Sequence, residues 1–261
     1  MYPRTRDSAQ AQRPRAWTPL TQGRAALFQT RPTLYADTIH SILSAALMTE
    51  RLTTTLYYQA LTTPAILRDS RLCGLSADPN RPGQAPNGAP QHVRFLQAAL
   101  DAEVKHAALL TNAGAVSPHR EFYFPPMTFA RLGLSTHRDS FLGVLEMLEA
   151  ASVAMYIAAA GQFARLGRHD LTALAGQIMG IEAEHRALGR VIAGMRPPNN
   201  LTLETASFTH SGAIGAALHP FLTGERFPFA DGATKATMLP SRAQTAYVVG
   251  KYGTRRIHRF L

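Results

Sequence analysis

Apolar residues recur at the spacing of an α-helix in four long segments of the chain. The expected helices cover approximately residues 37–61, 91–112, 139–166 and 170–193. Only a few residues separate the third helix from the fourth, which predicts that this pair is antiparallel. A loop rich in Pro and Gly (residues 62–90) and a second long connection (residues 113–138) separate the other helices. The pattern predicts an all-α four-helix bundle with a long crossover between helices two and three.

Residues that favour helix ends support these boundaries. Asp139 is expected near the start of the third helix and Asp170 at the N-cap of the fourth, because a short acidic side chain accepts hydrogen bonds from free N–H groups there. Gly167 and Gly194 suit the positions just beyond the two helices.

The chain divides into three regions on this pattern. A basic N-terminal arm (residues 1–32) precedes the bundle (residues 33–195), and an irregular Pro- and Gly-rich extension with a basic tail follows it (residues 196–261). Weaker helical patterns occur in the extension at residues 210–218 and 242–252. We expect the extension to pack on the bundle.

Each predicted helix carries an acid on the face that should be buried. The first and third have one such glutamate, whereas the second and fourth have a Glu-x-x-His motif, whose two side chains emerge one turn apart on one face. The residues are Glu50, Glu103 with His106, Glu149, and Glu182 with His185.

Burying four carboxylates without compensation would be prohibitive in a medium of low polarity. Two divalent cations would balance the four charges, and two neutral imidazoles would complete the ligand set. Oxygen and nitrogen donors suit iron or manganese, and iron is the favoured choice here. Di-metal carboxylate bundles combine one Glu from each of two helices with Glu-x-x-His from the other two. A single Glu-x-x-His is weak evidence, but the joint pattern indicates a metal site.

Two tyrosines repeat the spacing of the lone glutamates. Tyr57 follows Glu50 by seven residues, and Tyr156 follows Glu149 by seven. They are candidates to hydrogen-bond the ligating carboxylates, and the alternative is that they are ordinary core residues.

Other polar residues near the pattern have simpler interpretations. Glu146 precedes Glu149 by one turn, and we expect it on the flank of the apolar face, paired with an arginine or solvated. Glu184 is expected on the surface, because two residues further along it points to another side of the helix than Glu182. Cys73, the single cysteine, excludes an internal disulfide framework and has no apparent histidine partner.

The segments that carry these residues resemble the ferritin-like superfamily, and most of all the ferritin-like domain proteins akin to plant desiccation-related proteins. The similarity spans roughly residues 35–205 and is carried by "ALMTERLTTTLYYQAL", "DAEVKHAALL", "MLEAASVAMYIAAA" and "IMGIEAEHRAL", with a weaker match at "PPNNLTLE". It implies a four-helix bundle with a di-metal site. It further implies that Glu103 and Glu182 bridge the metals. The remaining ligands would be Glu50 and His106 on one metal, and Glu149 and His185 on the other.

The net charge of +10 is concentrated at the two ends. Residues 1–31 hold six arginines against one aspartate, and residues 242–261 hold five basic residues and no acid. Such ends can contact nucleic acid or an anionic membrane, although solvated tails are the favoured interpretation. No apolar stretch like that of a secretory signal follows the basic N-terminus, which predicts a cytoplasmic location, but many relatives of this subgroup are exported.

These observations lead to one main hypothesis and two alternatives. The main hypothesis is a di-metal protein, with iron as the favoured metal, that reacts with dioxygen or hydrogen peroxide in Fe(II) oxidation or peroxide removal. The first alternative is a manganese catalase. The second is a non-enzymatic protective or scaffold bundle whose basic ends bind nucleic acid, membrane or partners. A homo-oligomer is compatible with the sequence, whereas the loops and tail argue against a ferritin-type cage.

Overall fold

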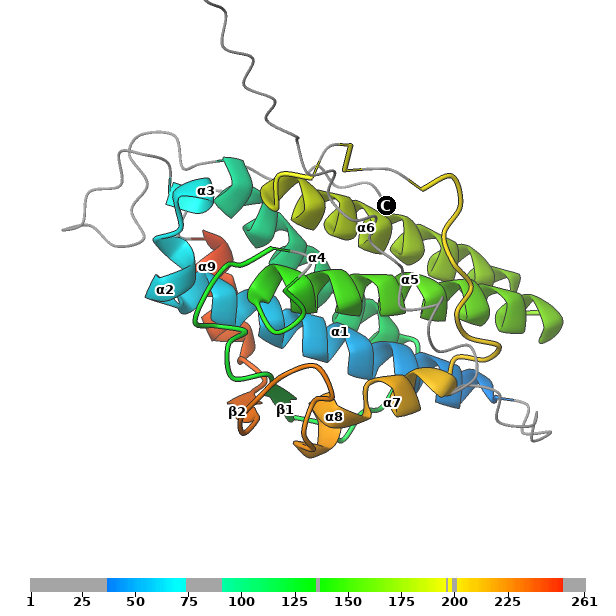
Figure 1. The fold of residues 1–261 in the computed structure, drawn as a ribbon. Coiled ribbons are helices and arrows are strands. Elements are labelled where there is room, and N and C mark those ends of the chain that lie inside the picture. The colour runs from blue at the N-terminus through cyan, green and yellow to red at the C-terminus, as the bar shows by residue number, and fades with distance from the viewer. Residues whose placement is uncertain (1–36, 74–90, 135–136, 196, 199–200, 251–261) are drawn as a thin grey trace, which may run out of the picture. The chain divides into compact units, whose positions relative to one another are not determined.

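Four long helices form the body of the protein (Figure 1). The computed structural model describes residues 37–73, 91–134, 137–195, 197–198 and 201–250. The helices are α1 (Ile39–Thr62), α4 (Gln91–Asn112), α5 (Phe141–Arg165) and α6 (His169–Ile192). The predicted all-α bundle is therefore confirmed, with helix limits within about two residues of those expected.

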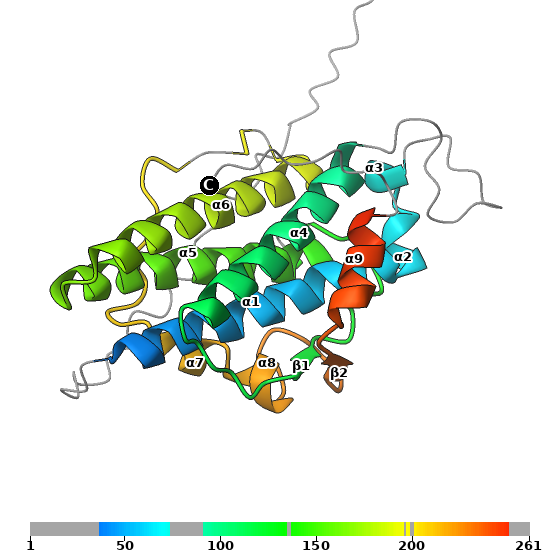
Figure 2. The same cartoon turned by 180° about the vertical axis from the view of Figure 1, so that it is seen from behind.

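The bundle is built from two packed pairs of helices. α1 lies along α4, and α5 lies along α6, which three residues join to it; α1 and α5 connect the pairs (Figures 1 and 2). Apolar side chains from all four helices form one continuous core. α5 is long and apolar enough to cross a membrane by length and composition, but 78% of its most apolar window is buried within the protein, as in a core helix.

Side-chain hydroxyl groups cap the N-termini of two of these helices. Thr38 and Ser41 form a reciprocal capping box at the start of α1. Ser140 caps α5 by accepting a hydrogen bond from the backbone N–H of Gly143. Asp139, expected near the start of this helix, lies just outside it and accepts a hydrogen bond from Arg131 at 2.8 Å.

The expected N-cap of the fourth helix is wrong by two residues. Arg168 occupies the N-cap of α6, and Asp170 lies in its first turn. The carboxylate of Asp170 accepts two hydrogen bonds from the Arg168 guanidinium, at 2.9 and 2.6 Å. Asp170 still adds negative charge at the helix N-terminus, where it is favourable.

The long connections contain more regular structure than the sequence predicted. The start of the Pro-rich loop forms two short helices, α2 (Pro64–Leu67) and α3 (Ser70–Cys73), and the rest of that loop lies outside the described residues. The connection from α4 to α5 contains strand β1 (Glu121–Phe124), which pairs antiparallel with β2 (Lys235–Met238).

The C-terminal extension packs on the bundle through this sheet and three short helices, α7 (Ala213–Ala217), α8 (His219–Thr223) and α9 (Arg242–Gly250). Phe122 and Phe124 of β1 are fully buried, and Phe124 lies edge-on to Phe221 of α8 at 5.9 Å between ring centroids. α9 contacts α1 and α4, as Figure 2 shows. The predicted division at residues 32 and 195 stays a prediction.

Gly143 lies where the chain before α5 passes closest to the helix. A Cβ on this glycine would lie 2.0 Å from the carbonyl oxygen of His137 and 2.8 Å from Cα of Arg138. By contrast, a Cβ on Gly176 of α6 would meet no atom within 4 Å.

We therefore expect opposite effects from two Gly→Ala substitutions. Gly143→Ala should lower the free energy of unfolding by about 1–3 kcal/mol, because backbone must move to admit the methyl group. Gly176→Ala should raise it by about 0.5–1 kcal/mol, because alanine restricts the unfolded chain and favours the helix. Urea denaturation of both variants measures this, and equal effects would contradict the close approach at Gly143.

Candidate metal centre

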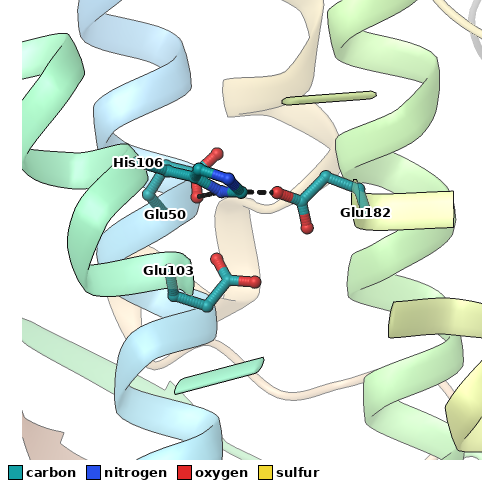
Figure 3. Close-up of side chains that lie close together, drawn as sticks. All are labelled: Glu50, Glu103, His106 and Glu182. Carbon is teal, nitrogen blue, oxygen red and sulfur yellow. Dashed lines mark hydrogen bonds and ion pairs between the residues drawn. The ribbon is translucent and has the colours of Figure 1, made fainter. Parts of the chain in front are cut away.

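The six predicted side chains converge in the core of the bundle. Glu50 comes from α1, Glu103 and His106 from α4, Glu149 from α5, and Glu182 and His185 from α6. None is more than 7% exposed, and three of the four glutamates are fully buried. Figure 3 shows Glu50, Glu103, His106 and Glu182 pointing toward one another from three helices.

The six residues form two overlapping groups of potential metal ligands. One group contains Glu50 and His106, the other contains Glu149 and His185, and both contain Glu103 and Glu182. Within each group one donor atom from every residue lies within 4.8 Å of the others. Besides the shared Glu103 and Glu182, each group therefore contains one further glutamate and one histidine.

Two tyrosines reach across the bundle to the carboxylates that are not shared. Tyr57 of α1 donates a hydrogen bond to Oε1 of Glu149 on α5, at 2.6 Å. Tyr156 of α5 donates one to Oε1 of Glu50 on α1. Both rings are almost fully buried, so each phenol hydroxyl has its partner inside the protein.

One further contact was not anticipated from the sequence. The hydroxyl of Thr53 donates a hydrogen bond to Oε2 of Glu103, at 2.6 Å. Thr53 follows Glu50 by one helical turn, so the sequence already places it on the same buried face of α1. Threonine is common on helix faces without a hydrogen bond to a buried carboxylate, so its spacing alone did not identify Thr53 as a contact of the cluster.

Several oxygen and nitrogen atoms of the cluster have no hydrogen-bond partner among the residues that the structure describes. They are Oε1 of Glu103, Oε2 of Glu149, both carboxylate oxygens of Glu182, and Nδ1 of His185. The last atom lies 2.9 Å from Oε1 of Glu103, but the geometry is not that of a hydrogen bond. Buried polar atoms are rarely left unpaired in folded proteins. Free oxygen and nitrogen lone pairs that face one another fit a hard or borderline divalent cation.

Without a cation, the buried carboxylates of the cluster are unfavourable in their charged form. Burial, together with the nearby Glu182 and Glu103, holds the pKa of Glu149 well above its ordinary value. Burial and Glu50 likewise raise the pKa of Glu103. For His106, burial acts to lower the pKa, but the adjacent carboxylates of Glu182 and Glu50 outweigh it and raise the pKa to about 10. Burial is the main reason that the two glutamate pKa values are raised, and neighbouring carboxylates raise the pKa of all three groups.

A family model for the ferritin-like domain matches residues 38–195, which is more than half of the chain. The chain belongs to this ferritin-like family. The match covers the four long helices and every residue of the cluster. Comparison with curated proteins and with solved structures gives no match. The finer resemblance to desiccation-related proteins stays a prediction.

In this ferritin-like bundle, Glu146 is held away from the cluster by an arginine. The guanidinium of Arg190 donates to both carboxylate oxygens of Glu146, at 2.6 to 3.1 Å. Glu146 is 5% exposed and Arg190 3% exposed. The pairing with arginine was one of the two arrangements expected for Glu146. Glu184, as predicted, is exposed.

The buried pair predicts a strong asymmetry between single and double substitutions. Arg190→Met should lower the free energy of unfolding by about 3–5 kcal/mol, because it leaves a buried carboxylate unpaired. The double variant Glu146→Leu/Arg190→Met should cost much less. Urea denaturation checks both, and metal content provides the control: if the double variant loses its metal, Glu146 belongs to the metal centre.

Proposed function

We propose that the buried cluster holds two divalent metal ions, with iron as the favoured metal, and that the protein reacts with dioxygen or hydrogen peroxide. The observation that carries the proposal is the pair of overlapping ligand groups, which share two buried glutamates and leave five donor atoms without a hydrogen-bond partner. Membership of the ferritin-like family supports the same conclusion.

The proposed assignment of metal ligands is based on which residues the two groups share. Glu103 and Glu182 would contribute to both metal sites, Glu50 and His106 would complete one site, and Glu149 and His185 would complete the other. Tyr57 occupies Oε1 of Glu149, whose Oε2 has no hydrogen-bond partner among the described residues, and Tyr156 occupies Oε1 of Glu50, whose Oε2 lies 3.3 Å from Nδ1 of His106. These hydrogen bonds hold the carboxylates in place before a metal arrives, which lowers the cost of organising the site.

The donor set supports iron or manganese and offers no thiolate for softer metals. Two Fe(II) ions in such a site supply two electrons, which together with two protons reduce hydrogen peroxide to two molecules of water. The protein itself excludes bulk water from the cluster, because the surrounding residues of all four helices are buried. Fe(II) oxidation and peroxide removal are the two outcomes we propose.

Metal stoichiometry should depend on which glutamate is removed. The unmodified protein should bind about two Fe(II) per chain under anaerobic conditions. Glu50→Ala should retain about one, because Glu50 belongs to one ligand group only, whereas Glu182→Ala should lose most of both. Glu184→Ala is the matched control, since this exposed glutamate lies on the same helix, and should still bind two. Equal losses in Glu182→Ala and Glu184→Ala would refute the assignment.

The reaction itself is tested by admitting oxygen or peroxide to the loaded protein. We expect Fe(II) to be oxidised faster than in buffer, and the acceleration to disappear in Glu182→Ala while it persists in Glu184→Ala. Stopped-flow absorbance in the near ultraviolet measures the rate. Oxygen evolution from peroxide by manganese-loaded protein, without Fe(II) oxidation, would favour the manganese catalase alternative instead.

The non-enzymatic alternative depends mainly on the basic ends. Those residues lie largely outside the described part of the chain, so the structure adds no support to binding of nucleic acid or membrane through them. The buried cluster favours metal chemistry over this alternative.

A further inference from the structure

A second site candidate lies on the outer side of the α1–α4 pair, where the segment that leads into α9 covers it. It is a cavity of about 280 Å³, lined by Leu47, Arg51, Thr54, Val104, Ala107, Ala108, Thr111, Arg120, Leu239, Pro240, Ser241, Arg242 and Thr245. We name it the arginine cavity. None of the six residues of the metal cluster lines it.

In the described part of the chain, three arginines and no acid line the arginine cavity. Among the described residues, Arg51, Arg120 and Arg242 form no ion pair, although Arg51 donates a hydrogen bond to the carbonyl oxygen of Ser117. Arg51 and Arg120 lie close enough that burial and the charge of Arg120 together lower the pKa of Arg51. Uncompensated guanidinium groups that share a cavity attract an oxyanion, which they can bind with two N–H donors each.

Thr54 adds an independent observation. Its side chain is 4% exposed, and its hydroxyl has no hydrogen-bond partner. The other threonines of α1 behave differently: Thr49, Thr55 and Thr62 each donate to the carbonyl four residues earlier, and Thr53 donates to Glu103. That bond to the preceding turn is the usual solution for a helical threonine. The Thr54 hydroxyl therefore has no partner among the described residues, and Thr54 lies one turn from Arg51 on the cavity wall.

The remaining wall of the arginine cavity is mainly apolar. Leu47, Val104, Ala107, Leu239 and Pro240 contribute it. An inorganic anion alone would leave this surface without contacts. The volume falls at the lower end of that of small-molecule sites, so the occupant is smaller than a drug-sized ligand. The strongly basic ends of the chain carry the wrong sign of charge to fill it.

We propose that the arginine cavity binds a small organic oxyanion, a carboxylate or phosphate ester, whose charged group meets Arg51, Thr54 and Arg120. The short apolar part of this ligand lies against Leu47, Val104 and Leu239. The site is independent of the proposed metal function.

The test uses four probes on the full-length protein, with and without metal. They are hexanoate, hexyl phosphate, hexanamide and inorganic phosphate. Isothermal titration calorimetry should show binding of at least one of the two hexyl anions with a Kd of about 1 mM or below, and comparison of these two identifies the preferred head group. Hexanamide and inorganic phosphate should bind at least tenfold more weakly. Equal binding with and without metal separates this site from anion binding at the metal centre.

Two variants locate the binding. Thr54→Val should leave thermal stability unchanged or raised, because the hydroxyl it removes has no partner, and should weaken binding of the preferred anion about fivefold. Arg120→Met should weaken it about tenfold. Arg94→Met is the matched control, since Arg94 is an exposed arginine of α4 outside the cavity lining, and should bind as the unmodified protein does.

Three results would overturn the proposal. The first is no binding of either hexyl anion below about 10 mM. The second is binding that only the metal-loaded protein shows, or that hexanamide or inorganic phosphate matches. The third is anion binding that Thr54→Val and Arg120→Met leave unchanged.

Discussion

Four carboxylates in the dry centre of a helical bundle are the constraint on which this structure depends. Each of the four long helices contributes one, and none of the four is more than 1% exposed. Such a cluster is unfavourable as four anions, and the raised pKa values of Glu103 and Glu149 express that cost. Two divalent cations would turn the same cluster into a stabilising feature, because metal binding to a folded site adds to folding stability.

The protein supports these carboxylates from outside the cluster with hydroxyl groups. Tyr57, Tyr156 and Thr53 each donate to one oxygen of a different glutamate. Glu182 has no such hydroxyl donor among the described residues; its Oε1 lies 3.0 Å from Nδ1 of His106, and its Oε2 lies 3.4 Å from Nδ1 of His185. The tyrosine contacts cross between α1 and α5, the two helices that contribute a single residue each to the cluster, and so tie together the two helix pairs.

The sequence predicted the bundle well because its helices alternate between a wide apolar face and polar positions at one consistent period. The cluster was predictable for the same reason, because the helical period places one glutamate of each helix, and the histidine of each Glu-x-x-His motif, on the buried face. Asp170 was misplaced because an adjacent arginine, Arg168, holds its carboxylate. The pairing of β1 with β2 was missed because it joins residues more than one hundred positions apart, which no local pattern encodes. The missing hydrogen-bond partner of Thr54 could not be predicted, because it depends on how the side chains around this residue pack.

The most direct test of the central claim is anomalous diffraction from crystals of the metal-loaded protein, with data on both sides of the iron and manganese absorption edges. Two peaks should lie among the six side chains, about 3.5–4 Å apart, with Glu103 and Glu182 between them. Peaks elsewhere, a single peak, or an empty cluster in crystals grown with excess metal would contradict the account.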